Sequence, residues 1–444
     1  MAPTSPASTA RHPARGQCAA ALILTLLAGR VDAQLGLPSL PVPLPLPGQV
    51  IDRATQALGD SQDRLLAPII DARAAAARAL IRQHRALIEA DPAGAPIVRA
   101  ELLAFGPDAS ALRAATAAGF EILRREALGG LDSELVTLRG PAGLSTARSL
   151  ARLRHIDPAG EYDYNHIYLP SGTAGDEAAA DAAGAADAAL PSPPLAGARI
   201  GMIDSGVDST HPALALSRVQ QSGCGGHVLP AAHGTAVASL IAGSAENFRG
   251  ALPGAPLIAV DVYCAEVTGG STDRVVLAFA TLTRAGVAVI NVSLVGPRNA
   301  ALARVVAAVQ ERGVLVVAAV GNDGPAAPPL YPAALPGVIA VTGVDAHDHV
   351  LPEAGRGSHV VFAAPGAELR AADLQHGYAT VRGTSYAAPI VAGLLAGLLG
   401  PEPDGTPHAL QSLILTARDL GPRGRDAIYG YGVVGESVRS ASAP

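Results

Sequence analysis

Four polar residues, in the chain order Asp204, His233, Asn322 and Ser385, have types and surroundings suited to acyl transfer. A serine hydroxyl is too weak an acid to attack a peptide carbonyl at neutral pH, so Ser385 needs a base, and His233 can take its proton. Asp204 can hold the imidazole in the required tautomer and stabilise its charged form. The side-chain amide of Asn322 and the backbone N–H of Ser385 can donate hydrogen bonds to the tetrahedral oxyanion. We therefore interpret these residues as a catalytic triad with an oxyanion donor.

Each of these residues lies where a predicted secondary-structure element begins or ends. Asp204 ends an apolar run and Asn322 follows another, whereas His233 opens an amphipathic helix and Ser385 lies near the start of a nearly all-apolar one. Short apolar runs that alternate with helical stretches predict an α/β fold, a doubly wound and mostly parallel sheet with helices on both faces. Ligands bind beyond the carboxyl ends of such strands, which is where we expect these side chains to meet. The predicted strands span 198–204, 257–263, 288–294, 314–322, 338–344 and 359–366.

Other nucleophilic sites fit the sequence less well. An α/β-hydrolase would carry its serine first and in a G-x-S-x-G turn, but residues 383–387 read GTSYA and lack the second glycine. The chain contains no lysine, which excludes a Ser–Lys dyad, a P-loop lysine and a Lys Schiff base.

The region before the predicted sheet divides into segments of different composition. Residues 1–33 combine two arginines, an apolar run over 19–29 and small residues at 31 and 33, which predicts a signal peptide and an exported protein. Residues 34–92 are a Pro-rich spacer followed by an Ala/Arg-rich helix at 50–90, and 93–170 have the order βαββαβ of a small ferredoxin-like α+β domain. Residues 171–194 predict an exposed linker before the domain at 195–444.

Composition restricts the partners and the metal chemistry. A net charge of −6 and the absence of tryptophan give no basic or stacking surface for nucleic acid. No later segment offers about 20 apolar residues free of charge, so we expect no membrane span in the mature protein. Cys18 would leave with the signal peptide, and Cys224 and Cys264 then form an even pair, which favours a disulfide in an exported protein. A metal site that adds His227 to these two cysteines stays an alternative.

Five segments resemble the motifs of subtilisin-like serine peptidases, over about 195–420. They are DSGVDSTHP (204–212), HGTAVAS (233–239), INVSLVGP (290–297), AVGNDGP (319–325) and GTSYAAPIVAG (383–393). The resemblance implies a secreted serine endopeptidase of peptides or proteins, with Asp204, His233 and Ser385 as its triad and Asn322 in its oxyanion hole. It also implies that 93–170 is an inhibitory pro-domain that acts on the same chain, and that the part of the chain before roughly residues 170–195 is removed. We expect a monomer that needs no cofactor.

The resemblance further implies two strands that flank the substrate backbone. These are Gly269, Gly270 and Ser271 on one side, and Ser293, Leu294, Val295 and Gly296 on the other. Where the family commonly has smaller residues, this chain has Val295 and Val320, so we expect a narrow first specificity pocket that prefers small side chains. Ala213 stands where family members often carry an acid that binds calcium, so we expect that calcium site to be absent.

Two alternatives use the same fold. A catalytically silent protein would bind peptides without cutting them, and a ligase would pass the acyl group to an amine if water were kept out of the cleft. Fold alone does not separate these activities, because function resides in the site.

Overall fold

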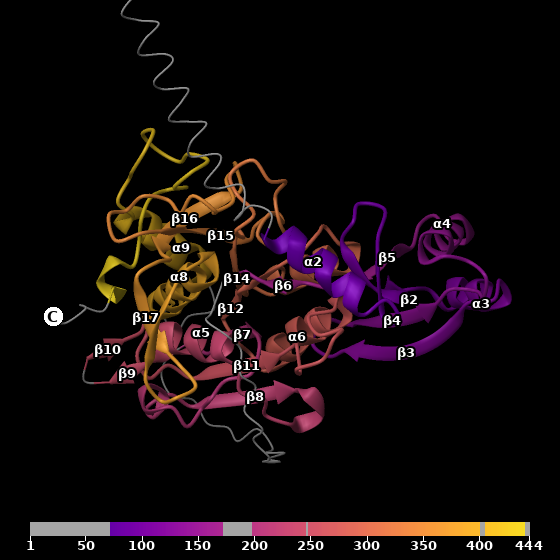
Figure 1. Cartoon of the computed structure of the whole chain (residues 1–444), viewed down its shortest axis with the longest axis horizontal. Coiled ribbons are helices and arrows are strands. Elements are labelled where there is room, and N and C mark those ends of the chain that lie inside the picture. The colour runs from indigo at the N-terminus through magenta and orange to yellow at the C-terminus, as the bar shows by residue number, and fades with distance from the viewer. Residues whose placement is uncertain (1–71, 172–197, 246, 400–404, 440–444) are drawn as a thin grey trace, which may run out of the picture. The chain divides into compact units, whose positions relative to one another are not determined.

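The computed structural model describes residues 72–171, 198–245, 247–399 and 405–439. Seven parallel strands form its main sheet, in the order β16-β15-β14-β12-β7-β11-β8 (Figure 1). The strands are β7 (Ile200–Asp204), β8 (Val219–Gly223), β11 (Leu257–Asp261), β12 (Val289–Val292), β14 (Leu315–Ala319), β15 (Ile339–Val344) and β16 (Val360–Pro365). The expected doubly wound α/β fold is therefore confirmed.

Helices cover both faces of this sheet, because successive strand residues point to opposite sides. In β14, Leu315 and Val317 pack into one apolar cluster with residues of α5 and α8, whereas Val316 and Ala318 pack into another with residues of α6 and α7. Both faces of the sheet are buried, which explains why the strand sequences are continuous apolar runs. The helices are α5 (Ala232–Ala242), α6 (Thr272–Arg284), α7 (Ala300–Gln310), α8 (Thr384–Leu398) and α9 (Gly405–Thr416).

A separate antiparallel sheet lies in the region that precedes residue 171. Its strands are β1 (Ile88–Ala90), β2 (Pro96–Phe105), β3 (Glu121–Leu128), β4 (Ser133–Arg139) and β5 (Glu161–His166), with β2 paired to β1, β4 and β5. Leucines of α3 (Ala109–Ala117) and α4 (Thr146–Ile156) pack with the strands in a small core. The expected βαββαβ order runs from β2 to β5, so this part is a small α+β domain, consistent with a pro-domain.

Two details differ from the sequence-based expectation. The described part of the helix expected at 50–90 is α2 (Ala72–Gln83), and residues 88–90 instead form β1, because they pair with the start of β2. The single strand expected through residue 170 divides into β5 and β6 (Leu169–Pro170), because β5 pairs with β2 whereas β6 pairs with β13 (Leu294–Val295) of the larger domain.

The remaining elements are short. They are β9 (Ser244–Ala245), β10 (Phe248–Arg249), the hairpin β17 (Leu369–Ala372) and β18 (Tyr378–Val381), and the 3-10 turns η1 (Pro212–Leu214), η2 (Cys224–Gly226) and η3 (Glu436–Val438). Among the described residues, none of the helices has the length and apolarity needed to cross a bilayer. The predicted signal peptide with Cys18, the Pro-rich spacer and most of the predicted linker lie outside the described residues.

Candidate active site

The carboxylate of Asp204 and the imidazole of His233 are hydrogen bonded inside the protein. Asp204 is the last residue of β7 and His233 the second of α5, and Asp204 Oδ1 lies 2.8 Å from His233 Nδ1. An ionised carboxylate accepts rather than donates, so Nδ1 of His233 donates the proton of this hydrogen bond. Ser205 joins the two elements, because its hydroxyl donates to Asp204 (3.1 Å) and accepts from the backbone N–H of Gly234 (3.0 Å).

Ser385 lies in the first turn of α8 and is fully buried. Its Oγ makes no hydrogen bond with any residue in the described ranges. The next residue, Tyr386, packs its ring against the imidazole of His233, with 5.3 Å between ring centroids. The nucleophile candidate and the base candidate are therefore linked through a buried aromatic side chain that directly follows the serine.

Asn322 lies just beyond β14 with a fixed amide orientation. Its Oδ1 accepts from the backbone N–H of Thr384 at 3.2 Å, so its Nδ2 must point the other way and donate. Thr384 in turn accepts from the backbone N–H of Gly321 through its hydroxyl (3.2 Å). The loop after β14 and the start of α8 thus hold Asn322 from two sides.

The carbonyl oxygen of Ser171 lies where these groups converge. It accepts from Asn322 Nδ2 and, at 3.3 Å, from the backbone N–H of Ser385. The sequence predicted that Ser171 begins an exposed linker. That prediction is wrong for this residue, because Ser171 is only 3% exposed and its carbonyl oxygen is held by these two donors. Two donors on one carbonyl oxygen are the arrangement that stabilises an oxyanion in acyl transfer.

The segment before Ser171 lies between two backbone segments of the larger domain, residues 269–271 and the strand β13. On one side Ile167 bridges Ser271, and the N–H of Tyr168 donates to the carbonyl of Gly270 at 2.8 Å. On the other side β6 pairs antiparallel with β13, and the N–H of Ser171 reaches the carbonyl of Ser293 at 3.4 Å. Both expected flanking segments lie beside this one. Leu294 and Val295 form β13, whereas Gly269 and Gly270 lie in a turn and Ser271 in an isolated bridge, so only one of the two is a strand; Gly296 follows β13 directly.

Apolar side chains fill the space behind Gly321, the residue before Asn322. A Cβ placed on Gly321 would lie 2.5 Å from Leu330 Cδ1 and 3.6 Å from Val295 Cγ1. Leu330 and Val320 also line a cavity of only about 10 Å³. Sequence reasoning identified Val295 and Val320 but missed Leu330, which lies in a Pro-rich loop without periodicity, just outside the motif AVGNDGP (319–325).

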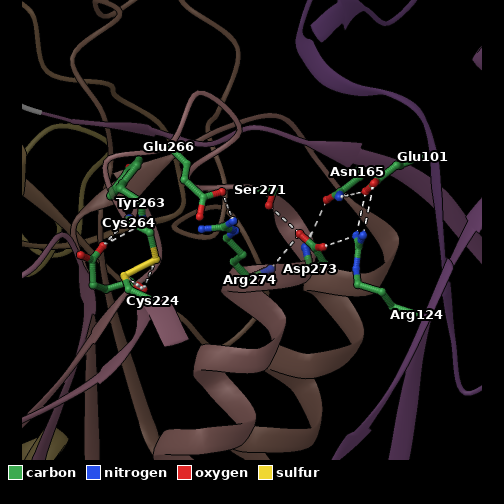
Figure 2. A network of polar contacts seen from close by, with 11 residues as sticks. Glu101, Arg124, Asn165, Cys224, Tyr263, Cys264, Glu266, Ser271, Asp273 and Arg274 are labelled. Carbon is green, nitrogen blue, oxygen red and sulfur yellow. Dashed lines mark hydrogen bonds and ion pairs between the residues drawn. A yellow bond between two sulfur atoms is a disulfide. The ribbon is translucent and has the colours of Figure 1, made fainter. Parts of the chain in front are cut away.

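A polar network connects the small N-terminal domain to residues 271–273 of the larger domain (Figure 2). Arg124 of β3 lies between Glu101 (2.9 Å) and Asp273 (2.8 Å), and Asp273 belongs to the first turn of α6. Asp273 also accepts from the hydroxyl of Ser271 at 2.5 Å, and its backbone N–H donates to the side chain of Asn165. The network therefore joins β2, β3 and β5 to the residues that flank the bound segment.

Glu126 adds a third carboxylate near Arg124, beside Glu101 and Asp273. Burial raises its pKa, and the negative charges of Asp273 and Glu101 raise it further, with Arg124 acting in the opposite direction. Asp273 belongs to the larger domain, so its share of this rise in the pKa of Glu126 exists only while the two domains are in contact.

Cys224 and Cys264 are joined in a disulfide with an S–S distance of 2.16 Å, which leaves neither thiolate for the metal site considered with His227. Asp261 lies beside them and accepts from the backbone N–H of Cys264 at 2.9 Å. Its pKa is raised by burial and by the charge of Asp204, its neighbour in the adjacent strand. At the position discussed for calcium, Ala213 presents a buried methyl group, which offers no oxygen ligand.

Comparisons with known proteins agree with this geometry. A sequence profile described as the subtilase family, peptidase S8, matches residues 196–432, more than half of the chain. Minor extracellular protease Epr of Bacillus subtilis is 39% identical over 125 residues, which are 28% of this chain but only 19% of that protein. Subtilisin DY of Bacillus licheniformis is 31% identical over 250 residues, which are 54% of this chain and 89% of that protein.

A solved structure shows the same fold. Fervidolysin from Fervidobacterium pennivorans, described as a keratinolytic enzyme related to subtilisin, superposes with a TM-score of 0.62 at 20% identity, over 78% of this chain and 61% of that one. The profile match, the shared fold and the arrangement of the buried polar residues together assign this chain to the subtilase family.

Proposed function

We propose that this protein is a secreted serine endopeptidase, made as a zymogen that cuts its own chain between Ser171 and Gly172. Asp204, His233 and Ser385 act as the triad, and Asn322 with the N–H of Ser385 forms the oxyanion hole. The observation that carries the proposal is the position of the Ser171 carbonyl oxygen between these two donors.

The proposed reaction assigns each of these groups a step. Ser385 Oγ adds to the carbonyl carbon of Ser171 while His233 Nε2 takes the hydroxyl proton. The tetrahedral intermediate expels the amine of Gly172, which receives that proton from His233, and leaves an ester between Ser171 and Ser385. Water, deprotonated by His233, then releases the Ser171 carboxylate and restores the serine.

Backbone contacts support an endopeptidase. The segment 167–171 is bound mainly by main-chain hydrogen bonds on both sides, a mode that tolerates varied side chains. The chain also continues beyond Ser171, so the bond in the cleft is an internal one. Apolar packing of Val295 and Leu330 behind Gly321 favours a small residue before the cut bond, as Ser171 is.

The small domain fits the role of an intramolecular inhibitor. Asp163 accepts from the N–H of Ala300 at the start of α7 (2.8 Å), and Asn165 accepts from Asp273 at the start of α6 (3.2 Å). Both contacts satisfy free N–H groups of helix N-termini. They hold β5 so that the following residues lie in the cleft, and substrate enters only after the segment leaves. In this proposal residues 1–33 direct export, 34–171 are removed, and the remainder of the chain is the mature monomeric enzyme.

The decisive experiment compares the exported wild-type protein with the Ser385→Ala variant, by intact mass and N-terminal sequencing, before and after a fluorophosphonate. We expect the wild type to begin at Gly172 and to gain one adduct, and the variant to keep residues up to 171 and gain none. If both proteins are folded but remain untrimmed and unlabelled, a silent peptide-binding protein is the better reading. Product analysis with an added amine separates hydrolysis from ligation.

A further inference from the structure

We propose that Glu353 and Arg382 are positioning residues, which together set the spacing of the two oxyanion donors. The inference rests on the proposed function, in which Asn322 and the N–H of Ser385 stabilise the oxyanion. Glu353 lies in the loop between β15 and β16, and Arg382 lies between β18 and α8. Both stand outside the motifs that indicated the catalytic groups, so sequence reasoning missed them.

The side chains of Glu353 and Arg382 form an ion pair with two hydrogen bonds. Arg382 Nε donates to Glu353 Oε1 at 2.7 Å, and Arg382 Nη2 donates to Glu353 Oε2 at 3.0 Å. A contact at two points fixes the orientation of both groups as well as their distance. Glu353 is only 5% exposed. Because a buried carboxylate is costly without a partner, this pair keeps the guanidinium group of Arg382 in one place.

The main chain beside Glu353 holds the loop that carries Asn322. The carbonyl oxygen of Glu353 accepts from the backbone N–H of Gly324 at 2.8 Å, and the N–H of Gly355 donates to the carbonyl oxygen of Gly321 at 3.0 Å. Gly321 and Gly324 stand on either side of Asn322. A shift of Glu353 therefore displaces the loop from which Asn322 Nδ2 points at the oxyanion.

Arg382 leads directly into the segment that carries the second donor. It stands three residues before Ser385, whose backbone N–H points at the same carbonyl oxygen as Asn322 Nδ2. Thr384 joins the two halves of the oxyanion hole directly, since its N–H donates to Asn322 Oδ1. Glu353 adds a further connection, because its main chain contacts one half and its carboxylate holds the residue that leads into the other.

A change in this spacing should appear in turnover rather than in substrate binding. Oxyanion donors act on the transition state more than on the bound substrate, so their displacement lowers kcat and leaves KM nearly unchanged. Losing one donor outright costs about 10²–10³ in turnover, and a displaced donor keeps part of its effect. We therefore expect kcat to fall about tenfold when the pair is broken.

The test measures kcat and KM of mature enzyme on the internally quenched peptide HIYLPSGTAG, which copies residues 166–175. Wild type is compared with Arg382→Ala, Glu353→Gln and the double variant, each titrated with a fluorophosphonate so that only competent sites are counted. We expect each single variant and the double variant to lose about tenfold in kcat, with KM within about twofold, because all three break one contact. Losses that multiply in the double variant would show that the two residues act separately and would overturn the proposal.

A peptide aldehyde with the sequence of residues 167–171 tests the oxyanion hole itself, because its hemiacetal with Ser385 Oγ carries an oxygen at the oxyanion position. Its inhibition constant should rise about tenfold in the variants, as kcat falls. Arg418→Ala is the matched control, because Arg418 also pairs with carboxylates, those of Asp348 and Glu436, and it should leave kcat and this constant within about twofold.

A purely structural pair gives a different result. If Arg382→Ala lowers the melting temperature but leaves kcat and the inhibition constant of the aldehyde unchanged, the proposal is overturned. A wild-type enzyme that takes up no fluorophosphonate and cuts no protein substrate would instead refute the proposed function.

Discussion

Replacing Leu330 by glycine should widen the specificity of this enzyme at the residue before the cut bond. A flat ring that touches a wall on each face needs those walls roughly 7 Å apart, twice the 3.5 Å contact distance of two carbon atoms. Here Leu330 Cδ1 and Val295 Cγ1 lie 2.5 Å and 3.6 Å from the point where a Gly321 Cβ would be. A benzyl side chain therefore has no room between them.

The magnitude follows from the cost of forcing extra atoms into a packed region, which is about 1–3 kcal/mol, or roughly a factor of 5–160 in kcat/KM. The wild type should accordingly cut a peptide with serine or alanine before the bond at least about fivefold better than one with phenylalanine. Leu330→Gly removes the obstructing methyl groups, and the ratio should fall to within about threefold of one.

The assay measures kcat/KM for peptides that read HIYLP-X-GTAG, with X as serine, alanine or phenylalanine, on titrated wild type and variant. Leu335→Ala is the matched control, because Leu335 is a nearby buried leucine that is not among the nearest neighbours of Gly321. Comparable cleavage of the phenylalanine and serine peptides by the wild type would refute a narrow pocket. An unchanged ratio in Leu330→Gly would show that Leu330 is not its wall.

Three further perturbations address the inhibited form and the disulfide. Arg73→Ala removes the 2.6 Å ion pair that ties α2 to Asp323, and should therefore speed maturation about two- to fivefold in a time course of trimming. Arg78 is exposed on the same helix, so Arg78→Ala should leave the rate of trimming unchanged. Asp273 raises the pKa of Glu126 only when the two domains are in contact, so the complex takes up a proton on forming. The added pro-domain should therefore inhibit more tightly as pH falls from neutral towards 4.5, and Glu126→Gln should inhibit more tightly at pH 7 and flatten this pH dependence. The disulfide between Cys224 and Cys264 closes a 40-residue loop, which stabilises the fold by about 4 kcal/mol through the chain entropy of the unfolded state. Replacing both cysteines by serine should therefore lower the melting temperature and raise KM. A reducing agent that alters neither the Tm nor the KM of the wild type would contradict this.

Much of the architecture could be predicted from the sequence, because its signals are local. The strand residues 315–319 are apolar at every position, since β14 is covered on both faces, and that pattern is legible in one chain. The residues proposed as catalytic stand at ends of such runs, where the sheet topology brings them to one edge. Asp204 and His233 are 29 residues apart, yet their 2.8 Å contact needed only the order of one strand and one helix.

Other features have no local signal. Leu330 packs on Gly321 across a loop, and nothing in PPLYP indicates which backbone it meets. The sequence also did not indicate where the last strand of the small domain ends. A run such as YNHIYLP (164–170) predicts one continuous strand, whatever partners its residues have. The strand breaks near Tyr168, because its partner changes from β2 to the two segments of the cleft, and only the tertiary arrangement contains that change.

The segment 167–171 lies where a substrate is proposed to bind, so its side chains indicate how much room each part of the site offers. Residues 167–171 face the same two segments that a substrate must face, so each side chain there reports the room and polarity of one subsite. A segment that is cut once and must then leave is under less pressure for tight side-chain contacts than for correct backbone placement, yet Tyr168 is fully buried and hydrogen bonded. Half-buried Leu169 and Pro170 show that the cleft does not demand such burial everywhere. The enzyme therefore encloses Tyr168 and leaves the next two side chains partly exposed, while the main-chain hydrogen bonds on both sides fix the course of the segment.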